Sequence, residues 1–143
     1  MKEYLFIDGS YYIFYRYFAL CQWWKNSHPD EPLELPSKND EFVLKFKNMF
    51  NKKLDELIKK LKLKPCVVYV GKDCMRDEIW RVKHYGEYKK NRVNNTDIGY
   101  FFEMVYKEKM FEKWNSATVL SYNNLEADDC IALSVKHINS LSD

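Results

Sequence analysis

The alternation of short β-prone runs with longer helical segments is the feature of this sequence that most restricts its fold. Three runs are short, apolar and rich in β-branched or aromatic residues, and they span residues 4–7, 66–70 and 117–121. Each is followed by at least one segment with helical character. Strands that are separated by helices pair in parallel through right-handed crossovers. The sequence therefore predicts an α/β protein, a three-layer α/β/α fold with a mostly parallel central sheet.

The segments between these runs carry helical periodicity and capping signals. Ser10 is a plausible cap for the first helix and Asp40 for the second, and three prolines within residues 26–39 indicate a loop between them. The second helix has an apolar stripe with steps of three or four residues, namely Val43, Phe46, Phe50, Leu54, Leu57 and Leu61. The helices expected in chain order are 11–24, 41–62, parts of 77–92, 97–113 and 125–140.

The length and the lack of long apolar runs indicate one domain that does not enter a membrane. The chain has 143 residues, the size of a single domain, and no run approaches the ~20 apolar residues that a bilayer span needs. Its N-terminus lacks the apolar core of a signal peptide, and its four cysteines form no C-x-x-C pair. We therefore expect one domain over residues 1–143, no membrane partner, no structural zinc and an intracellular location, cytoplasmic or nuclear.

Charge is distributed unevenly, although the net charge is only +2. Residues 41–95 carry a net charge of +8, whereas residues 1–40 carry −2 and residues 96–143 carry −4. A basic middle between acidic ends is typical of a protein that meets an anionic polymer on one face. The same pattern fits an ordinary solvated helix face, so charge alone leaves both interpretations open.

Acidic residues follow each of the three predicted strands. Asp8 ends the first strand, Asp73 trails the second by three residues, and the sequence Leu-Glu-Ala-Asp-Asp at 125–129 follows the third. Parallel strands share one C-terminal edge, which is where open α/β sheets bind ligands. We therefore expect five carboxylates near that edge, here named the acid cluster: Asp8, Asp73, Glu126, Asp128 and Asp129.

The acid cluster as a whole indicates a cation site, although each acid alone has a simpler explanation. An Asp before Gly is common in turns, and acids in the first turn of a helix favour its dipole. Two carboxylates about 4 Å apart, however, repel by roughly 4 kcal/mol at an effective dielectric near 20. A bound cation relieves this repulsion, and ligands that are all oxygen favour a hard ion. The sequence therefore predicts a Mg²⁺ or Mn²⁺ site.

A basic segment with interleaved aromatic residues, 80–92, precedes the last strand. On a helix, Arg92 and Tyr88 would each lie about 20° from Arg81 around the axis, and Lys89 would border them. Such a face can bind phosphates and stack a base. The alternative is a solvated basic helix whose Trp80 and Tyr88 lie in the core.

Four motifs, in this order, resemble the 5′–3′ exonuclease and flap endonuclease family. They lie at residues 6–10, 67–73, 80–92 and 125–129, and include Tyr-Lys-x-x-Arg and Glu-Ala-Asp-Asp. The family includes bacteriophage exonucleases, the 5′-nuclease domain of bacterial DNA polymerases and large-virus relatives. The resemblance extends over nearly the whole chain but only to the N-terminal, PIN-like half of the family. It implies a metal-dependent nuclease that hydrolyses DNA at 5′ ends or flaps, and it is compatible with a viral or phage source.

The resemblance also implies roles for individual residues. Arg81, Lys89 and Arg92 match positions that contact the scissile or adjacent phosphates and so take part in catalysis, and Tyr88 matches a residue that stacks on a base near the cut. The five members of the acid cluster match metal-site acids. At Asp73 the sequence departs from the pattern, because Gly71-Lys72 stand where the family usually has an apolar residue directly before this acid.

Family members continue with a Ser-x-Asp-x-Asp-like acid cluster and a helix-hairpin-helix element, and neither is present in these 143 residues. The expectation is therefore an N-terminal portion that cleaves DNA slowly or not at all alone, with a second polypeptide as a further expected partner. Two other functions stay open at this point. One is a nucleic-acid-binding module without catalysis, and the other is a PIN-like ribonuclease.

Overall fold

A parallel sheet of three strands forms the centre of the protein. The structure is a computed structural model, and it describes residues 2–90, 92 and 96–141. The strands are β1 (Glu3–Asp8), β2 (Cys66–Gly71) and β3 (Thr118–Leu120), in the spatial order β1-β2-β3. Both neighbouring pairs are parallel, with Asp8 opposite Gly71 and Gly71 opposite Leu120. The predicted α/β fold with a parallel central sheet is confirmed.

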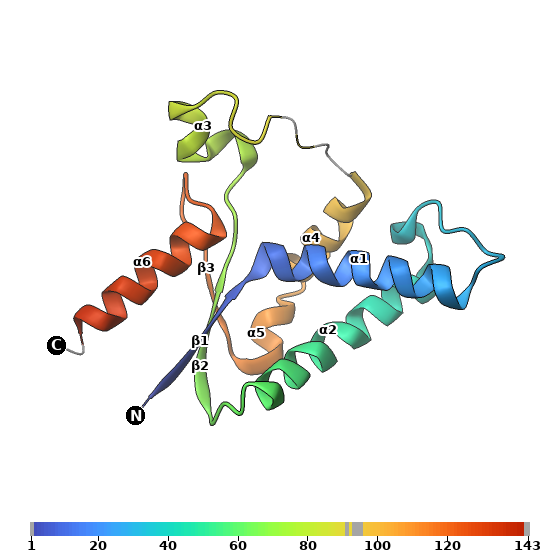
Figure 1. Cartoon of the computed structure of the whole chain (residues 1–143), viewed down its shortest axis with the longest axis horizontal. Coiled ribbons are helices and arrows are strands. Elements are labelled where there is room, and N and C mark those ends of the chain that lie inside the picture. Colours follow the sequence, from blue (N-terminus) through green and yellow to red (C-terminus); the bar gives the residue numbers. More distant parts are fainter. Residues whose placement is uncertain (1, 91, 93–95, 142–143) are drawn as a thin grey trace.

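Helices cover both faces of this sheet (Figure 1). The helices on one face are α1 (Gly9–Ser27), α2 (Asp40–Lys60), α4 (Thr96–Lys107) and α5 (Met110–Asn115). The helix on the other face is α6 (Ala127–Ser140), and the short α3 (Trp80–His84) lies beyond the carboxyl ends of the strands. Two short 3₁₀ turns, η1 (Pro36–Lys38) and η2 (Arg76–Glu78), precede α2 and α3. This arrangement is the expected three-layer architecture.

The core lies between the sheet and the larger helical layer. Leu5 and Ile7 of β1 and Val68 and Val70 of β2 are buried on that face. Opposite them, five phenylalanine rings are no more than 1% exposed: Phe42, Phe46, Phe50, Phe101 and Phe111. Burying one such ring contributes about 1.5–3 kcal/mol. This packing fixes the strands, and with them the edge where the acids lie.

The caps of the first two helices differ from the expected ones. Asp8, not Ser10, caps α1, because its carboxylate accepts a hydrogen bond of 2.9 Å from the Tyr11 backbone N–H. Asn39, not Asp40, caps α2 and accepts from the Phe42 N–H at 2.9 Å. The first prediction was wrong because α1 begins directly at the end of β1, which leaves the last strand residue in the cap position.

The helix expected at 97–113 is divided into two. The helix α4 ends at Lys107 and α5 begins at Met110, and between them Lys109 has the left-handed backbone angle φ 53°. A residue in that conformation cannot continue a right-handed helix. The apolar residues Ile98, Phe101, Val105 and Met110 of these two helices are buried nonetheless, and Phe102 is half-buried.

The basic segment is not one helix. Only Trp80–His84 is helical, Tyr85 is extended (φ −133°, ψ 91°), and residues 86–90 form turns in which Lys89 has φ 56°. The helical projection that related Arg81, Tyr88 and Arg92 was therefore wrong. Gly86, a poor helix former, lies at the point where the helix has ended. Among the helices that the structure describes, none is long and apolar enough to cross a membrane.

Candidate functional site

A pocket at the carboxyl edge of the sheet is lined by most of the residues that the sequence predicts for the site. Its volume is about 560 Å³. Its lining is Asp8, Ser10, Tyr11, Phe14, Asp73, Lys89, Arg92, Phe102, Glu126 and Asp128. Four of the five members of the acid cluster and two of the three expected cations thus share one cavity, here named the acid pocket. The fifth acid, Asp129, lies beside Arg81 instead.

Two glycines allow the start of α1, the end of β2 and the start of α6 to approach closely. A Cβ atom on Gly9 would lie 2.7 Å from Val70 Cγ1 and 2.8 Å from the Gly71 carbonyl oxygen. A Cβ atom on Gly71 would lie 2.5 Å from the Ala127 carbonyl oxygen, in the first turn of α6. Any side chain at Gly71 would therefore push α6, with its acids, away from the end of β2.

Asp73 reaches the acid pocket despite its departure from the family pattern. Its Oδ1 accepts a hydrogen bond of 2.6 Å from the Ala127 backbone N–H, and its own N–H donates to Ser10 Oγ at 3.4 Å. Asp73 therefore ties the end of β2 to the start of both α1 and α6. The residues before it, Gly71 and Lys72, serve this contact because Gly71 admits α6.

Three acids of the pocket, Asp8, Asp73 and Asp128, form no ion pair within the described residues 2–90, 92 and 96–141. Burial raises the pKa of Asp8, and the negative charges of Asp73 and Asp128 raise it further. The ionised carboxylates therefore repel one another, and a cation held between them would relieve that repulsion.

The other two acids, Glu126 and Asp129, are neutralised by the basic segment. Glu126 is 4% exposed and accepts hydrogen bonds from Arg81 at 2.7 Å, from the Tyr88 hydroxyl at 3.0 Å and from Lys89. Asp129 receives two bonds from Arg81, at 2.7 and 2.9 Å. A guanidinium that donates twice to one carboxylate is among the stronger ion pairs in proteins.

These contacts decide the protonation of both acids. Burial alone would raise the pKa of Glu126, but the hydrogen bonds from Lys89 and Tyr88 outweigh it and hold that pKa below its ordinary value. For Asp129, burial is likewise outweighed by the hydrogen bond from Arg81, and its pKa is lowered. The hydrogen bond to Asp129 in turn raises the pKa of Arg81. Both acids are therefore ionised at neutral pH.

Glu126 and Asp129 also form the capping box of α6. The Asp129 carboxylate accepts from the Glu126 backbone N–H at 3.1 Å, and the Glu126 side chain accepts in return from the third residue of the helix. The capping role that the sequence analysis weighed for these acids is thus present, and the same two carboxylates receive the ion pairs from Arg81. The consequence is that both carboxylates have fixed orientations.

The basic segment reaches the acids through turns instead of one helical face. Arg81 lies 4.6 Å from the centre of the Trp80 ring and 5.8 Å from that of Tyr88, and Lys89 lies 5.1 Å from that of Tyr88. Trp80 is 40% exposed, so the alternative that placed it in the core is wrong for this residue. Its indole N–H donates to Asp129 at 3.1 Å. Arg92 is exposed at the rim of the acid pocket.

Several residues of the site were not nominated from the sequence. Arg76 donates to the backbone carbonyls of Lys89 and Arg92, both at 3.4 Å, and so holds the turn that carries these cations. Tyr11 and Phe14 of α1 and Phe102 of α4 line the acid pocket. The sequence signal that could have indicated Tyr11 and Phe14 is the density of aromatic residues directly after Asp8, because an amphipathic helix does not need so many aromatic residues for its packing.

The acids fit a hard divalent cation. Carboxylate oxygens of Glu126, Asp128 and Asp129 lie within 4.8 Å of one another, and the acid pocket adds Asp8 and Asp73 from the other two strand ends. Such an all-oxygen donor set suits Mg²⁺ or Mn²⁺. Two of the three acids in this close group, Glu126 and Asp129, already pair with cations of the basic segment, whereas Asp128 forms no ion pair among the described residues.

Comparison with protein-family models matched residues 3–142 to one family, described as the 5′-3′ exonuclease, N-terminal resolvase-like domain. The match covers almost the whole chain. Comparisons with curated proteins and with solved structures gave no match.

Proposed function

Because this chain belongs to the family of 5′-3′ exonuclease N-terminal, resolvase-like domains, we propose that it is the metal-binding part of a nuclease that hydrolyses DNA at 5′ ends or flaps. The observation that carries this proposal is the acid pocket. It joins three unpaired carboxylates to two cationic side chains, Lys89 and Arg92, in one cavity. Metal-dependent hydrolysis of a phosphodiester uses both kinds of group: cationic side chains bind the negatively charged phosphate, and carboxylates hold the metal ion.

Asp8, Asp73 and Asp128 would hold Mg²⁺ or Mn²⁺. When bound, such an ion lowers the pKa of a coordinated water and polarises the phosphate oxygen. The three acids come from different strand ends, and Asp8 and Asp73 are each held by a backbone N–H. Their geometry is therefore set by the fold before any ligand arrives, which reduces the reorganisation that the reaction requires.

The cations of the basic segment would bind the phosphates of the substrate. Lys89 gives one bond to Glu126, and an ammonium group has three N–H donors. Lys89 can therefore keep Glu126 and still donate to a phosphate oxygen. Arg92 lies at the rim of the same pocket. We assign Lys89 to the scissile phosphate, Arg92 to an adjacent phosphate, and Tyr88 to a base next to the cut.

Arg81, unlike Lys89, already uses most of its hydrogen-bond donors within the protein. Its two terminal nitrogens give three bonds to Glu126 and Asp129, so fewer donors remain for a phosphate. We infer that Arg81 chiefly orients these two acids and reaches the phosphate by exchanging one of its present bonds.

The pairing of Glu126 and Asp129 with cations favours low turnover. Two-metal hydrolysis places ions roughly 3.5–4 Å apart, one for the attacking water and one for the leaving oxygen. Three unpaired acids suit one ion. A nucleic-acid-binding module without efficient cleavage is therefore the second candidate function, and a further polypeptide that supplies more ligands remains a proposed partner.

Cleavage of a labelled 5′-flap DNA in Mn²⁺ tests the proposal. Asp128 is exposed and has no cationic partner among the described residues, so Asp128→Asn removes a ligand with little effect on the fold. Asp30→Asn in the loop before α2 is the matched exposed control. We expect slow cleavage that requires the metal and falls at least about tenfold in Asp128→Asn alone.

Equal cleavage by Asp128→Asn and the wild type, or cleavage that persists in EDTA, would contradict the metal assignment. Binding of the flap without any cleavage would favour the second candidate function. Preferential cleavage of a matched RNA strand would identify a ribonuclease instead.

A further inference from the structure

The first helix carries a row of exposed aromatic side chains that the proposed chemistry does not use. Tyr11, Tyr15 and Trp23 of α1 are 66%, 52% and 37% exposed. Together with the exposed Ala19 they follow one another at intervals of four residues, so they form a single ridge along the helix. At 1.5 Å per residue the ridge is about 18 Å long from Tyr11 to Trp23.

One end of this ridge lies in the acid pocket, because Tyr11 is part of the pocket lining. The rings of Tyr11 and Tyr15 are stacked, with centres 6.2 Å apart and an interplanar angle of 26°. The Arg16 guanidinium lies 4.6 Å from the centre of the Tyr15 ring. These contacts lead from the acids of the acid pocket to the middle of α1 without a break.

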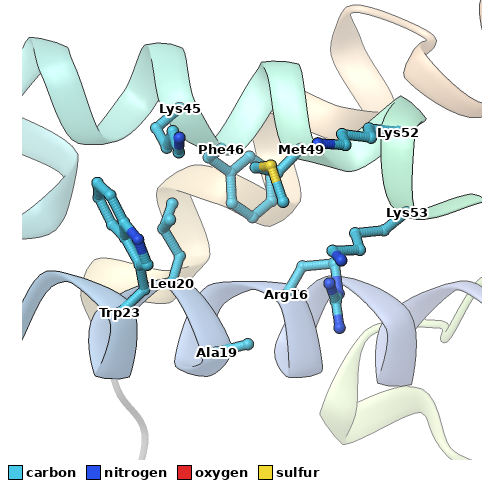
Figure 2. Close-up of a pocket in the computed structure, with 9 residues that line it drawn as sticks. All are labelled: Arg16, Ala19, Leu20, Trp23, Lys45, Phe46, Met49, Lys52 and Lys53. Atoms are coloured by element: carbon cyan, nitrogen blue, oxygen red, sulfur yellow. The ribbon is translucent and has the colours of Figure 1, made fainter. Parts of the chain in front are cut away.

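The other end of the ridge lies in a second pocket, of about 370 Å³, between α1 and α2. Figure 2 shows its lining, with Arg16, Ala19, Leu20 and Trp23 on α1 and Lys45, Phe46, Met49, Lys52 and Lys53 on α2. The floor of the pocket is apolar, and four cationic side chains surround it. The helix α2 returns alongside α1 over this length (Figure 1).

Three of the four cations in this pocket form no ion pair in the part of the chain that the structure describes. Lys53 pairs with Glu56 at 2.7 Å, whereas Arg16, Lys45 and Lys52 form no ion pair there. Arg16 Nε is buried without a hydrogen-bond partner among the same residues. Lys45 lies 4.7 Å from the centre of the Trp23 ring. Glu56 is the acid whose charge acts on Arg16 and Lys52 as well as on Lys53, so one carboxylate faces three of these cations. The pocket therefore combines an aromatic wall with an excess of positive charge.

We propose that the Tyr11–Tyr15–Trp23 ridge and the α1–α2 pocket form a binding track for the single-stranded part of a nucleic acid. The bases stack on the ridge, and the phosphates lie on Arg16, Lys45 and Lys52. Stacking platforms bordered by cations are how proteins bind single strands without sequence preference. A duplex does not fit this description, because its bases are already stacked on each other.

The identification of the ligand as a nucleic-acid strand rests on the proposed function, because the acid pocket lies at one end of the track. A strand that has its scissile phosphate near Lys89 would pass Tyr11 first and then continue along α1. The track would therefore hold the unpaired arm of the substrate, and the chain would favour ends with a single-stranded extension over blunt duplex ends.

Fluorescence anisotropy with labelled oligo-dT and oligo-U of eight nucleotides, in EDTA, tests the track separately from cleavage. We expect both oligonucleotides to bind the wild type, and Tyr15→Ala and Trp23→Ala each to weaken binding at least about fivefold, which corresponds to ~1 kcal/mol for one stacked base. Lys45→Ala should reduce the slope of log affinity against log salt by about 0.7. Tyr122→Ala and Lys136→Ala, matched exposed residues away from the track, should behave as wild type. Circular dichroism melting of each variant identifies any loss of fold.

The outcomes separate the track from the proposed function. Folded Tyr15→Ala and Lys45→Ala proteins that bind the oligonucleotides like the wild type would overturn the track, even if flap cleavage is observed. Binding that is weakened by these variants would uphold the track, even if no cleavage occurs. An acidic peptide with aromatic side chains that binds the pocket, while neither oligonucleotide binds, would identify a protein interface and would also overturn the proposal.

Discussion

Replacement of Gly71 by alanine tests how the fold brings the acids together. The added Cβ would lie 2.5 Å from the Ala127 carbonyl oxygen and 3.1 Å from the Ala127 Cα, whereas carbon atoms in contact normally lie about 3.5–4.0 Å apart. The obstructing atoms are backbone in the first turn of α6, so no side chain can rotate away. Either β2 or α6 must move by about 1 Å.

The cost of this movement can be estimated from its parts. Overpacking of a well-packed site costs typically about 1–3 kcal/mol. The same shift lengthens the 2.6 Å bond from the Ala127 N–H to Asp73, and a hydrogen bond to a charged group contributes about 1.5–3 kcal/mol. We therefore expect Gly71→Ala to lower the free energy of unfolding by at least about 1 kcal/mol, and more where that bond is lost.

Gly99→Ala is the matched control. Gly99 lies on the exposed side of α4, and a Cβ there meets no atom within 4 Å. Alanine in a helix is more favourable than glycine by about 0.5–1 kcal/mol, so this variant should be more stable than the wild type. Gly71→Ala should then be less stable than the wild type and Gly99→Ala more stable, so that the free energies of unfolding of the two variants differ by about 1.5–4 kcal/mol.

Urea unfolding followed by circular dichroism measures both variants, with Mn²⁺ affinity as a second readout. Gly71→Ala should unfold at lower urea and bind Mn²⁺ more weakly, whereas Gly99→Ala should unfold at higher urea and bind Mn²⁺ as the wild type does. A Gly71→Ala protein as stable as the wild type would refute the reasoning, because α6 would then not depend on close approach to β2.

Three further predictions concern the charges of the site. Asp8→Asn keeps the helix cap and removes a carboxylate whose pKa is raised. At pH 7 and without metal, this variant should therefore be at least as stable in urea as the wild type, although it should bind Mn²⁺ more weakly. A marked loss of stability would contradict this expectation. The pKa values of Glu126 and Asp129 are lowered, so their stabilisation is present above their ordinary values, 4.5 and 3.8, and is lost as pH falls through the folded values. As the pH is lowered from 7 to 3, the urea midpoint of unfolding should accordingly fall less steeply for Glu126→Gln than for the wild type. Parallel curves for the two proteins would contradict the stabilising role of the Glu126 carboxylate. Lys89→Ala should weaken DNA binding and reduce its salt slope by about one, and an unchanged slope would show that Lys89 contacts no phosphate.

The strands and the gathering of the acids were predictable from the sequence for simple reasons. A strand such as 66–70 is defined by a few neighbouring residues, and parallel strands must end at the same edge. Asp8, Asp73 and Glu126 therefore met in one pocket as expected, although their positions in the chain lie far apart. Their roles as metal ligands remain a prediction.

The course of the basic segment could not be predicted in this way. A helical projection assumes unbroken helix from Arg81 to Arg92, whereas the chain leaves helix at Tyr85 and takes a left-handed conformation at Lys89. Three-dimensional contacts, among them the bonds from Arg76 to two carbonyls, hold that path. Such contacts join residues more than ten positions apart, and no local pattern records them.

The division of the acid cluster into paired and unpaired acids was also not visible in the sequence. It depends on how closely α6 approaches α3, which places Glu126 and Asp129 against Arg81. Charge counts along the chain treat all five acids alike. Only the fold assigns cations to two of them and leaves three to repel one another.

The position of Asp8 at the junction of β1 and α1 restricts how this protein can change in evolution. The side chain starts the helix on which the core is built, and it also lines the acid pocket. A substitution to an apolar residue removes both functions and costs about 1 kcal/mol of helix stability. Asn, Ser, Thr and Gly are compatible with the cap position while discarding the charge. A lineage that abandons the chemistry of this pocket should therefore pass through one of these four residues at position 8, and its descendants would remain folded and carry that residue as a record of the loss.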